Sequence, residues 1–136
     1  MHNVYNSLSA IAACVKLGIS MEDIREGLKN FTGTDRRFQK KGVFNGVTVV
    51  DDYAHHPDEI TATLNSAAMC PHNNIWCVFQ PHTYSRTKAL MPEFAKALAL
   101  ADKVVLAKIY PARETDNLGI SSANLCELIK AEGKEC

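Results

Sequence analysis

The chain has 136 residues, which is enough for one domain with a substantial hydrophobic core. Lysine plus arginine and aspartate plus glutamate number 15 each, and this balance argues against a general attraction to nucleic acid or to an anionic membrane. Hydrophobic residues make up 46% of the chain, so disorder is not expected. No apolar stretch approaches the ~18 residues of a membrane span, and the first residues do not resemble a secretory signal.

The cysteines favour a reducing compartment. Their number is odd and no C-x-x-C pair occurs, so neither a disulfide framework nor a zinc site is predicted. Most of them lie within or beside apolar patterns, where a free cysteine behaves as a small hydrophobic residue. We therefore expect free thiols and a cytoplasmic protein. The cysteines are Cys14, Cys70, Cys77, Cys126 and Cys136.

Two helices are predicted at the start of the chain. Apolar residues recur at helical spacing from Val4 to Val15, and Gly18 is a natural C-terminal stop. Ser20 with Asp23 then resembles the capping arrangement that begins a second helix.

A β-hairpin is predicted after a break at residues 32–35, where the period of the apolar residues changes from helical to two. Asn45-Gly46 lies between two apolar, β-branched runs, which is the strongest short-range signal of a hairpin.

Beyond the hairpin, helix and strand patterns alternate. They are a helix at 57–68, a strand at 75–79, a helix at 87–100 that Pro92 bends or restarts, a strand at 103–110 and a helix at 122–131. This alternation indicates right-handed βαβ units, and therefore an α/β fold with a mostly parallel sheet.

A first cluster of candidate functional residues, Asp-Asp-Tyr-Ala-His-His-Pro at 51–57, directly follows a strand. In open α/β sheets, ligands bind at the carboxyl ends of the strands, where a carboxylate can accept hydrogen bonds from ribose hydroxyls. The acidic pair could equally be a solvated loop. Of His55 and His56, we expect one to cap the helix that Pro57 opens and the other to contact substrate. Adjacent histidines rarely converge on one ion, so no metal site is expected.

A second cluster, Phe-Gln-Pro-His-Thr-Tyr-Ser-Arg at 79–86, follows the next strand. The guanidinium of Arg86 can grip a carboxylate with two parallel hydrogen bonds, although Arg86 could also be a surface residue that pairs with Glu93. His82 lies in the same turn. The third strand ends similarly, in Tyr-Pro-Ala-Arg-Glu at 110–114, so three strand ends together resemble one edge of an active site.

Two smaller groups could belong to a nucleotide site. The amides of Asn3 and Asn6 could read an adenine edge, or simply cap the first helix. The basic pair Arg36-Arg37 could contact phosphates at a domain junction, or be a solvated linker. Neither a G-x-x-x-x-G-K-[ST] nor a G-x-G-x-x-G loop occurs in the sequence.

Taken together, these segments resemble the Mur ligases of bacterial peptidoglycan synthesis over essentially the whole chain. The segments are His2-Asn3-x-x-Asn6, Arg36-Arg37-Phe38, the cluster at 51–57 and the cluster at 79–87. The resemblance implies that residues 1–31 are the last helices of a central ATP-binding domain and that 32–37 form an interdomain junction. Residues 38–136 would then be part of a Rossmann-like C-terminal domain.

The resemblance also implies an activity, the ATP-dependent joining of L-alanine to UDP-N-acetylmuramate through an acyl phosphate. These small molecules would be the only partners, with neither nucleic acid nor membrane involved. ATP and Mg²⁺ would be bound mainly upstream of this chain, which would therefore be inactive alone. The implied ATP-binding residues are Asn3, Asn6, Arg37 and Asp52. The implied L-alanine pocket consists of Tyr53, His55, His82 and Arg86.

Two alternatives stay open. A murein tripeptide recycling ligase of the same family shares a D-D-[YF]-A-H-H-P segment, but not the F-Q-P-H-x-Y-S-R-T turn. A non-catalytic fragment that binds amino acid or nucleotide is the other alternative. The chain begins inside a helical pattern and ends where another strand is expected, so we expect a piece of a longer protein.

Overall fold

The computed structural model describes the backbone of residues 2–136 and the side chains of residues 4–136. They form two compact units, Met1–Asp35 and Arg36–Cys136. The first unit contains both predicted helices, α1 (His2–Lys16) and α2 (Met21–Asn30). Ser20 caps α2 as predicted, because its hydroxyl oxygen accepts a hydrogen bond of 3.1 Å from the backbone N–H of Asp23.

The second unit begins with the predicted hairpin, formed by the antiparallel strands β1 (Gln39–Phe44) and β2 (Val47–Asp51). Asn45 and Gly46 have φ angles of 49° and 82°, which are the left-handed values that a two-residue type I′ turn requires. The hairpin therefore confirms the prediction made from this dipeptide.

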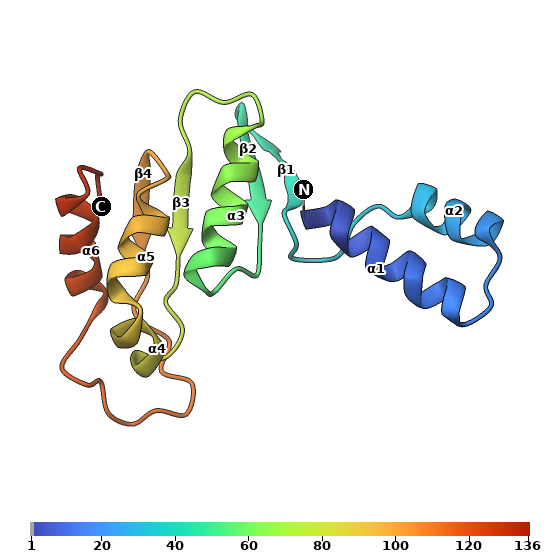
Figure 1. The fold of residues 1–136 in the computed structure, drawn as a ribbon. Helices are drawn as coiled ribbons and strands as arrows, with labels where there is room; N and C mark the ends of the chain where they lie inside the picture. The colour runs from blue at the N-terminus through green and yellow to red at the C-terminus, as the bar shows by residue number, and fades with distance from the viewer. Residues whose placement is uncertain (1) are drawn as a thin grey trace. The chain divides into compact units, whose positions relative to one another are not determined.

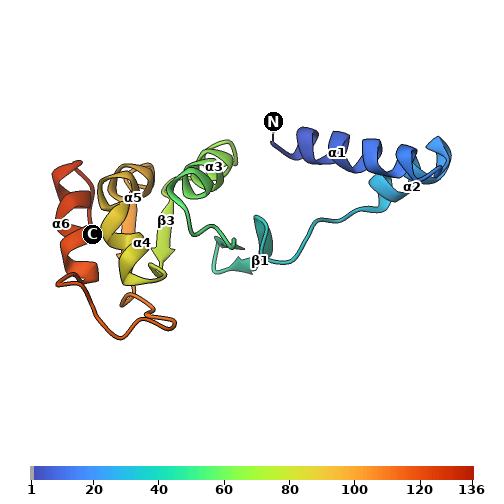
Figure 2. The same ribbon diagram turned by 60° about the horizontal axis from the view of Figure 1, so that its bottom comes forward.

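The rest of the second unit is a small α/β layer (Figure 1). The strands β3 (Trp76–Phe79) and β4 (Lys103–Leu106) are parallel neighbours. The helices are α3 (Pro57–Ala68), α4 (Tyr84–Ala89), α5 (Met91–Leu98) and α6 (Ser122–Ala131). Figure 2 shows α3, α5 and α6 together on one face of the strands. None of the described helices is long and apolar enough to cross a membrane.

One face of β3 and β4 packs against these helices and the other is bare. Phe79 and Val104 point into the core, where the Phe79 ring lies 5.7 Å from that of Phe94. Because successive side chains of a strand point to opposite faces, their neighbours Val78 and Val105 remain 77% and 44% exposed. Most of the core comes from the helices, through Ile60, Leu64, Phe94, Leu98, Leu125 and Ile129.

The predicted α/β fold with parallel strands is confirmed, and within it the hairpin and the β3–β4 pair are separate two-stranded sheets. Two predictions about element boundaries were wrong. The strand predicted at 103–110 ends at Leu106, and an isolated bridge joins Tyr110 to His82. The helix predicted at 87–100 begins earlier, at Tyr84, because Thr83 supplies a side-chain cap. It restarts at Met91, so the effect predicted for Pro92 is confirmed.

The expectation of free cysteines is wrong for Cys126 and Cys136, which form a disulfide with a Cα–Cα distance of 5.6 Å. The pairing follows from the path of the chain after α6. Gly133, with a φ of 82°, turns the backbone, and Glu135 then bridges to Lys103 at the start of β4. Cys14, Cys70 and Cys77 are free, and burial raises the pKa of the Cys77 thiol to about 11.

Candidate functional site

The loop that follows β2, residues 52–56, is held by the side chain of Asp52. One carboxylate oxygen accepts a hydrogen bond of 2.8 Å from the N–H of Ala54. The other accepts one of 2.7 Å from the N–H of Phe38, which precedes the hairpin. A carboxylate has about four lone-pair positions. Asp52 therefore organises the loop and retains capacity for further donors, such as ribose hydroxyls.

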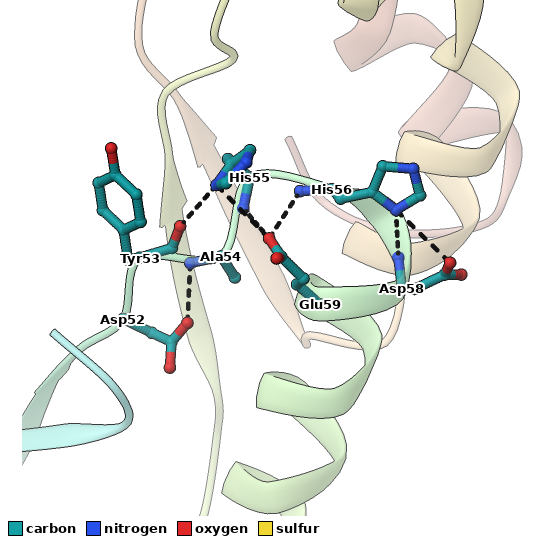
Figure 3. A network of polar contacts seen from close by, with 7 residues as sticks. All are labelled: Asp52, Tyr53, Ala54, His55, His56, Asp58 and Glu59. Atoms are coloured by element: carbon teal, nitrogen blue, oxygen red, sulfur yellow. Dashed lines mark hydrogen bonds and ion pairs between the residues drawn. The ribbon is translucent and has the colours of Figure 1, made fainter. Parts of the chain in front are cut away.

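Glu59 secures the two histidines of the same loop (Figure 3). Its carboxylate accepts hydrogen bonds from the backbone N–H groups of His55 and His56, at 2.9 Å and 3.2 Å. The bond from His55 is the main reason why the pKa of Glu59 lies below its usual range, and the charges of His55 and Arg37 add to it. Glu59 is thus a positioning residue that the sequence analysis missed, although it lies in the predicted first turn of a helix.

One of the two histidines caps α3 as predicted, and the substrate contact expected of the other stays a prediction. The ring of His56 accepts a hydrogen bond from the N–H of Asp58 and forms the N-terminal cap of α3, in a capping box with Glu59. The His55 ring instead uses Nδ1 to donate to the carbonyl oxygen of Tyr53, at 3.0 Å. In a neutral ring this bond directs the lone pair to Nε2. His55 is thus the histidine that is available to a substrate.

Tyr53 is packed by the first residue of the unit, Arg36. The guanidinium carbon of Arg36 lies 4.5 Å from the centroid of the Tyr53 ring, and the Tyr53 N–H donates to the Arg36 carbonyl at 2.8 Å. The ring also meets His55 edge to face at 5.4 Å. Arg37, the member of the basic pair that was predicted to serve the nucleotide, is exposed. The contact of Arg36 with Tyr53 was not predicted, because it depends on a φ of 57° at Arg36 that the sequence does not signal.

The turn that follows β3, residues 80–86, contains the other two predicted pocket residues. His82 is exposed, and its ring lies 5.4 Å from that of Tyr110. Arg86 is half-buried in the first turn of α4. Between them, Thr83 has a φ of 69°, an unusual value for a β-branched residue. Such outliers cluster at functional sites.

Glu114 approaches this turn from the loop after β4. Its carboxylate accepts hydrogen bonds from the backbone N–H groups of Tyr84 and Ser85 and from the Ser85 hydroxyl. The Ser85 hydroxyl is the main reason why the pKa of Glu114 lies below its usual range. The sequence signal was the polar cluster at the end of the third strand, but its role was not predicted.

The loops after β2, β3 and β4 lie at the same end of the second unit, the lower end in Figure 1. The structure therefore brings Asp52, Tyr53 and His55 to the same edge as His82 and Arg86. Asn6 is exposed on α1 in the first unit, and the side chain of Asn3 lies outside the described residues. Among the described side chains, no group of three or more His, Cys, Asp or Glu residues could hold a metal ion.

The second unit is an α/β unit with carboxylate, histidine and arginine side chains at its strand ends, which is where ligands bind in open α/β folds. Residues 36–136 match the sequence profile of the family described as "Mur ligase, glutamate ligase domain". The chain therefore belongs to the Mur ligase family.

Known members of the family match this chain over essentially its whole length. A protein of Lachnospira eligens named UDP-N-acetylmuramate–L-alanine ligase is 74% identical over 136 residues, which are 100% of this chain and 30% of that protein. The crystal structure of UDP-N-acetylmuramate–alanine ligase from Thermotoga maritima matches with a TM-score of 0.77 and 36% identity, over 99% of this chain and 28% of that one. A murein peptide ligase from Psychrobacter arcticus matches with a TM-score of 0.66 and 28% identity, over 97% and 26%. The chain thus spans less than a third of the relatives it matches.

Proposed function

We propose that this chain is part of an ATP-dependent ligase that joins L-alanine to UDP-N-acetylmuramate in peptidoglycan synthesis. The observation that carries the proposal is the 74% identity, over all 136 residues, to a protein of that name. The murein peptide ligase is a weaker match in both identity and TM-score, 28% and 0.66 against 36% and 0.77, which favours L-alanine over a peptide as the amino substrate.

We assign Asp52 to the nucleotide. Its carboxylate is half-buried and retains lone pairs after accepting the N–H groups of Phe38 and Ala54, so it fits ribose hydroxyls. Asn3, Asn6 and Arg37 are assigned to the same nucleotide from the family resemblance. When bound, ATP would supply the phosphoryl group that activates the carboxylate of UDP-N-acetylmuramate. The phosphates and Mg²⁺ are assigned to parts of the ligase outside residues 1–136, because the phosphate-loop motif does not occur within them.

We assign the L-alanine pocket to the loops after β2 and β3. Arg86 would bind the carboxylate of the amino acid with its planar guanidinium fork. His55, whose Nδ1 is engaged with the carbonyl of Tyr53, would present Nε2 to the amino group. Tyr53 and His82 would line the pocket with exposed rings. The carboxylate and the amino group of L-alanine would thus be bound by side chains from two neighbouring loops.

A hybrid ligase tests the proposal. Residues 1–136 replace the matching 136 residues of the Lachnospira eligens protein, and phosphate release is measured with ATP, UDP-N-acetylmuramate and either L-alanine or murein tripeptide. We expect release that depends on L-alanine and is lost in the Arg86→Ala hybrid. Release with the tripeptide alone would assign the chain to the recycling ligase. A folded hybrid that is inactive with both would leave the chain as a non-catalytic fragment.

A further inference from the structure

The loop after β4 is tied to the turn after β3 by its backbone. The N–H of Thr83 donates to the carbonyl of Tyr110, and the N–H of Tyr110 donates to the carbonyl of Pro81, both at 2.8 Å. The His82 and Tyr110 rings lie beside this pair of bonds, with their centroids 5.4 Å apart and their planes tilted by 35°. Residues 80–86 therefore have one side fixed against the end of the neighbouring strand.

The other side of the turn is fixed by Glu114. Its carboxylate receives the N–H groups of Tyr84 and Ser85, and the Ser85 hydroxyl donates to it as well. These residues lie 29 to 30 positions away in the sequence. Both carboxylate oxygens are engaged with the turn itself. Glu114 therefore accepts three hydrogen bonds from the turn and holds its backbone in place.

The conformation held in this way is a strained one. Thr83 has a φ of 69° and a ψ of 142°, and a threonine does not adopt such values without support from its neighbours. Thr83 itself donates to Tyr110, and the two residues that follow it donate to Glu114. It also connects His82 to the short helix that begins at Tyr84 and contains Arg86. A change in the Thr83 backbone would therefore alter the direction of His82 relative to Arg86.

We propose that Glu114 is a positioning residue for the amino-acid pocket, which clamps residues 82–86 in the conformation that lets His82 and Arg86 bind one small amino acid together. This inference rests on the proposed function for the role of the pocket, but the clamp itself can be tested without any activity. The lowered pKa of Glu114 agrees with a carboxylate that stays ionised within the clamp.

The clamp is tested in the 136-residue chain by hydrogen exchange of the Tyr84 and Ser85 amides. In Glu114→Ala we expect their exchange to accelerate by about tenfold or more, with a smaller change in Glu114→Gln, which keeps an acceptor oxygen. Asp116→Asn is the matched control, because Asp116 lies in the same loop and accepts a hydrogen bond from the nearby Leu118 N–H, away from the turn. Unchanged exchange at Tyr84 and Ser85 in Glu114→Ala overturns the clamp.

The positioning role is tested in the hybrid ligase. We expect Glu114→Ala to raise the KM for L-alanine by about tenfold or more and to leave the KM for ATP unchanged, because a small displacement of binding groups is costly. Glu114→Gln should recover part of the loss. An unchanged KM for L-alanine, in a variant whose amides exchange faster, overturns the positioning role. An inactive wild-type hybrid instead counts against the proposed function and leaves the exchange result to decide on the clamp.

Discussion

The loop after β2 and the turn after β3 are both held by a glutamate, but the two glutamates come from different distances along the chain. Each presents a histidine at a strand end, and in each a glutamate carboxylate accepts two successive backbone N–H groups. In the first loop the glutamate is Glu59, only 4 residues after His55. In the second it is Glu114, which is 30 residues after Tyr84. The histidines of the first loop are therefore held by a local contact, whereas the second turn depends on β4 and the loop that follows it.

The largest effect is expected from Arg86→Ala in the hybrid ligase. Loss of a charge-assisted bidentate contact costs about 2 to 4 kcal/mol, so the KM for L-alanine should rise about 30- to 1,000-fold, with the KM for ATP nearly unchanged. Arg86→Lys should recover only part of this loss. Lys96→Ala, which removes an exposed cation from α5, is the control and should change neither constant. Equal changes in both constants for Arg86→Ala would mean that the two pockets are misassigned.

Ile109→Ala should separate the two loops. Ile109 is 6% exposed and precedes Tyr110, whose backbone holds Thr83. Truncation of a buried isoleucine costs about 2 to 4 kcal/mol of the free energy of unfolding. We expect the amides of Thr83 to Ser85 to lose protection from exchange while those of His55 and His56 keep theirs under native conditions. Ile109→Val should show a smaller effect of the same kind, and parallel loosening of both loops would contradict the distinction between local and remote clamping.

Asp52→Ala should affect the first loop alone. The change leaves the partly buried N–H groups of Phe38 and Ala54 without their acceptor, at a cost of about 1 to 3 kcal/mol. In the hybrid ligase we expect the KM for ATP to rise more than that for L-alanine. Asp51→Ala is the matched control for the neighbouring carboxylate. If Asp51→Ala reproduces the ATP effect, the ribose contact belongs to a different residue than we propose.

Acid should weaken both clamps, with the smallest effect of the four predictions. The pKa values of Glu59 and Glu114 lie below their usual range in the folded chain. Each carboxylate therefore stabilises the fold fully above the usual glutamate pKa of about 4.3, and this contribution disappears as the pH falls through the lowered value. Titration of the two carboxyl groups by NMR should give midpoints below the usual glutamate value of about 4.3. A midpoint at or above the usual value for either group would contradict its role as an ionised clamp.

Features that depend on neighbouring residues could be predicted from the sequence, and features that depend on remote contacts could not. Ser20, Asn45-Gly46 and the histidine cap of α3 were predicted correctly, because each signal lies within four residues of its structural effect. Glu114 and the pairing of Cys126 with Cys136 were not predicted, because both depend on where the chain returns after β4 and α6. The assignment of substrate roles to Arg86 and Asp52 came from the family resemblance and stays a prediction.

The bare face of β3 and β4 carries a residue whose fluorescence reports on that face. Trp76 is the single tryptophan, its side chain is 60% exposed on that face, and the Lys103 ammonium lies 5.1 Å from its ring centroid. Trp76 begins β3, at the end opposite to the candidate site (Figure 1). Tryptophan emission should therefore be that of a water-exposed indole, and it should not change when an amino acid binds. Self-association through this face would remove the indole from water and shift its emission to shorter wavelengths. Fluorescence therefore distinguishes self-association through the sheet from binding of an amino acid at the loops.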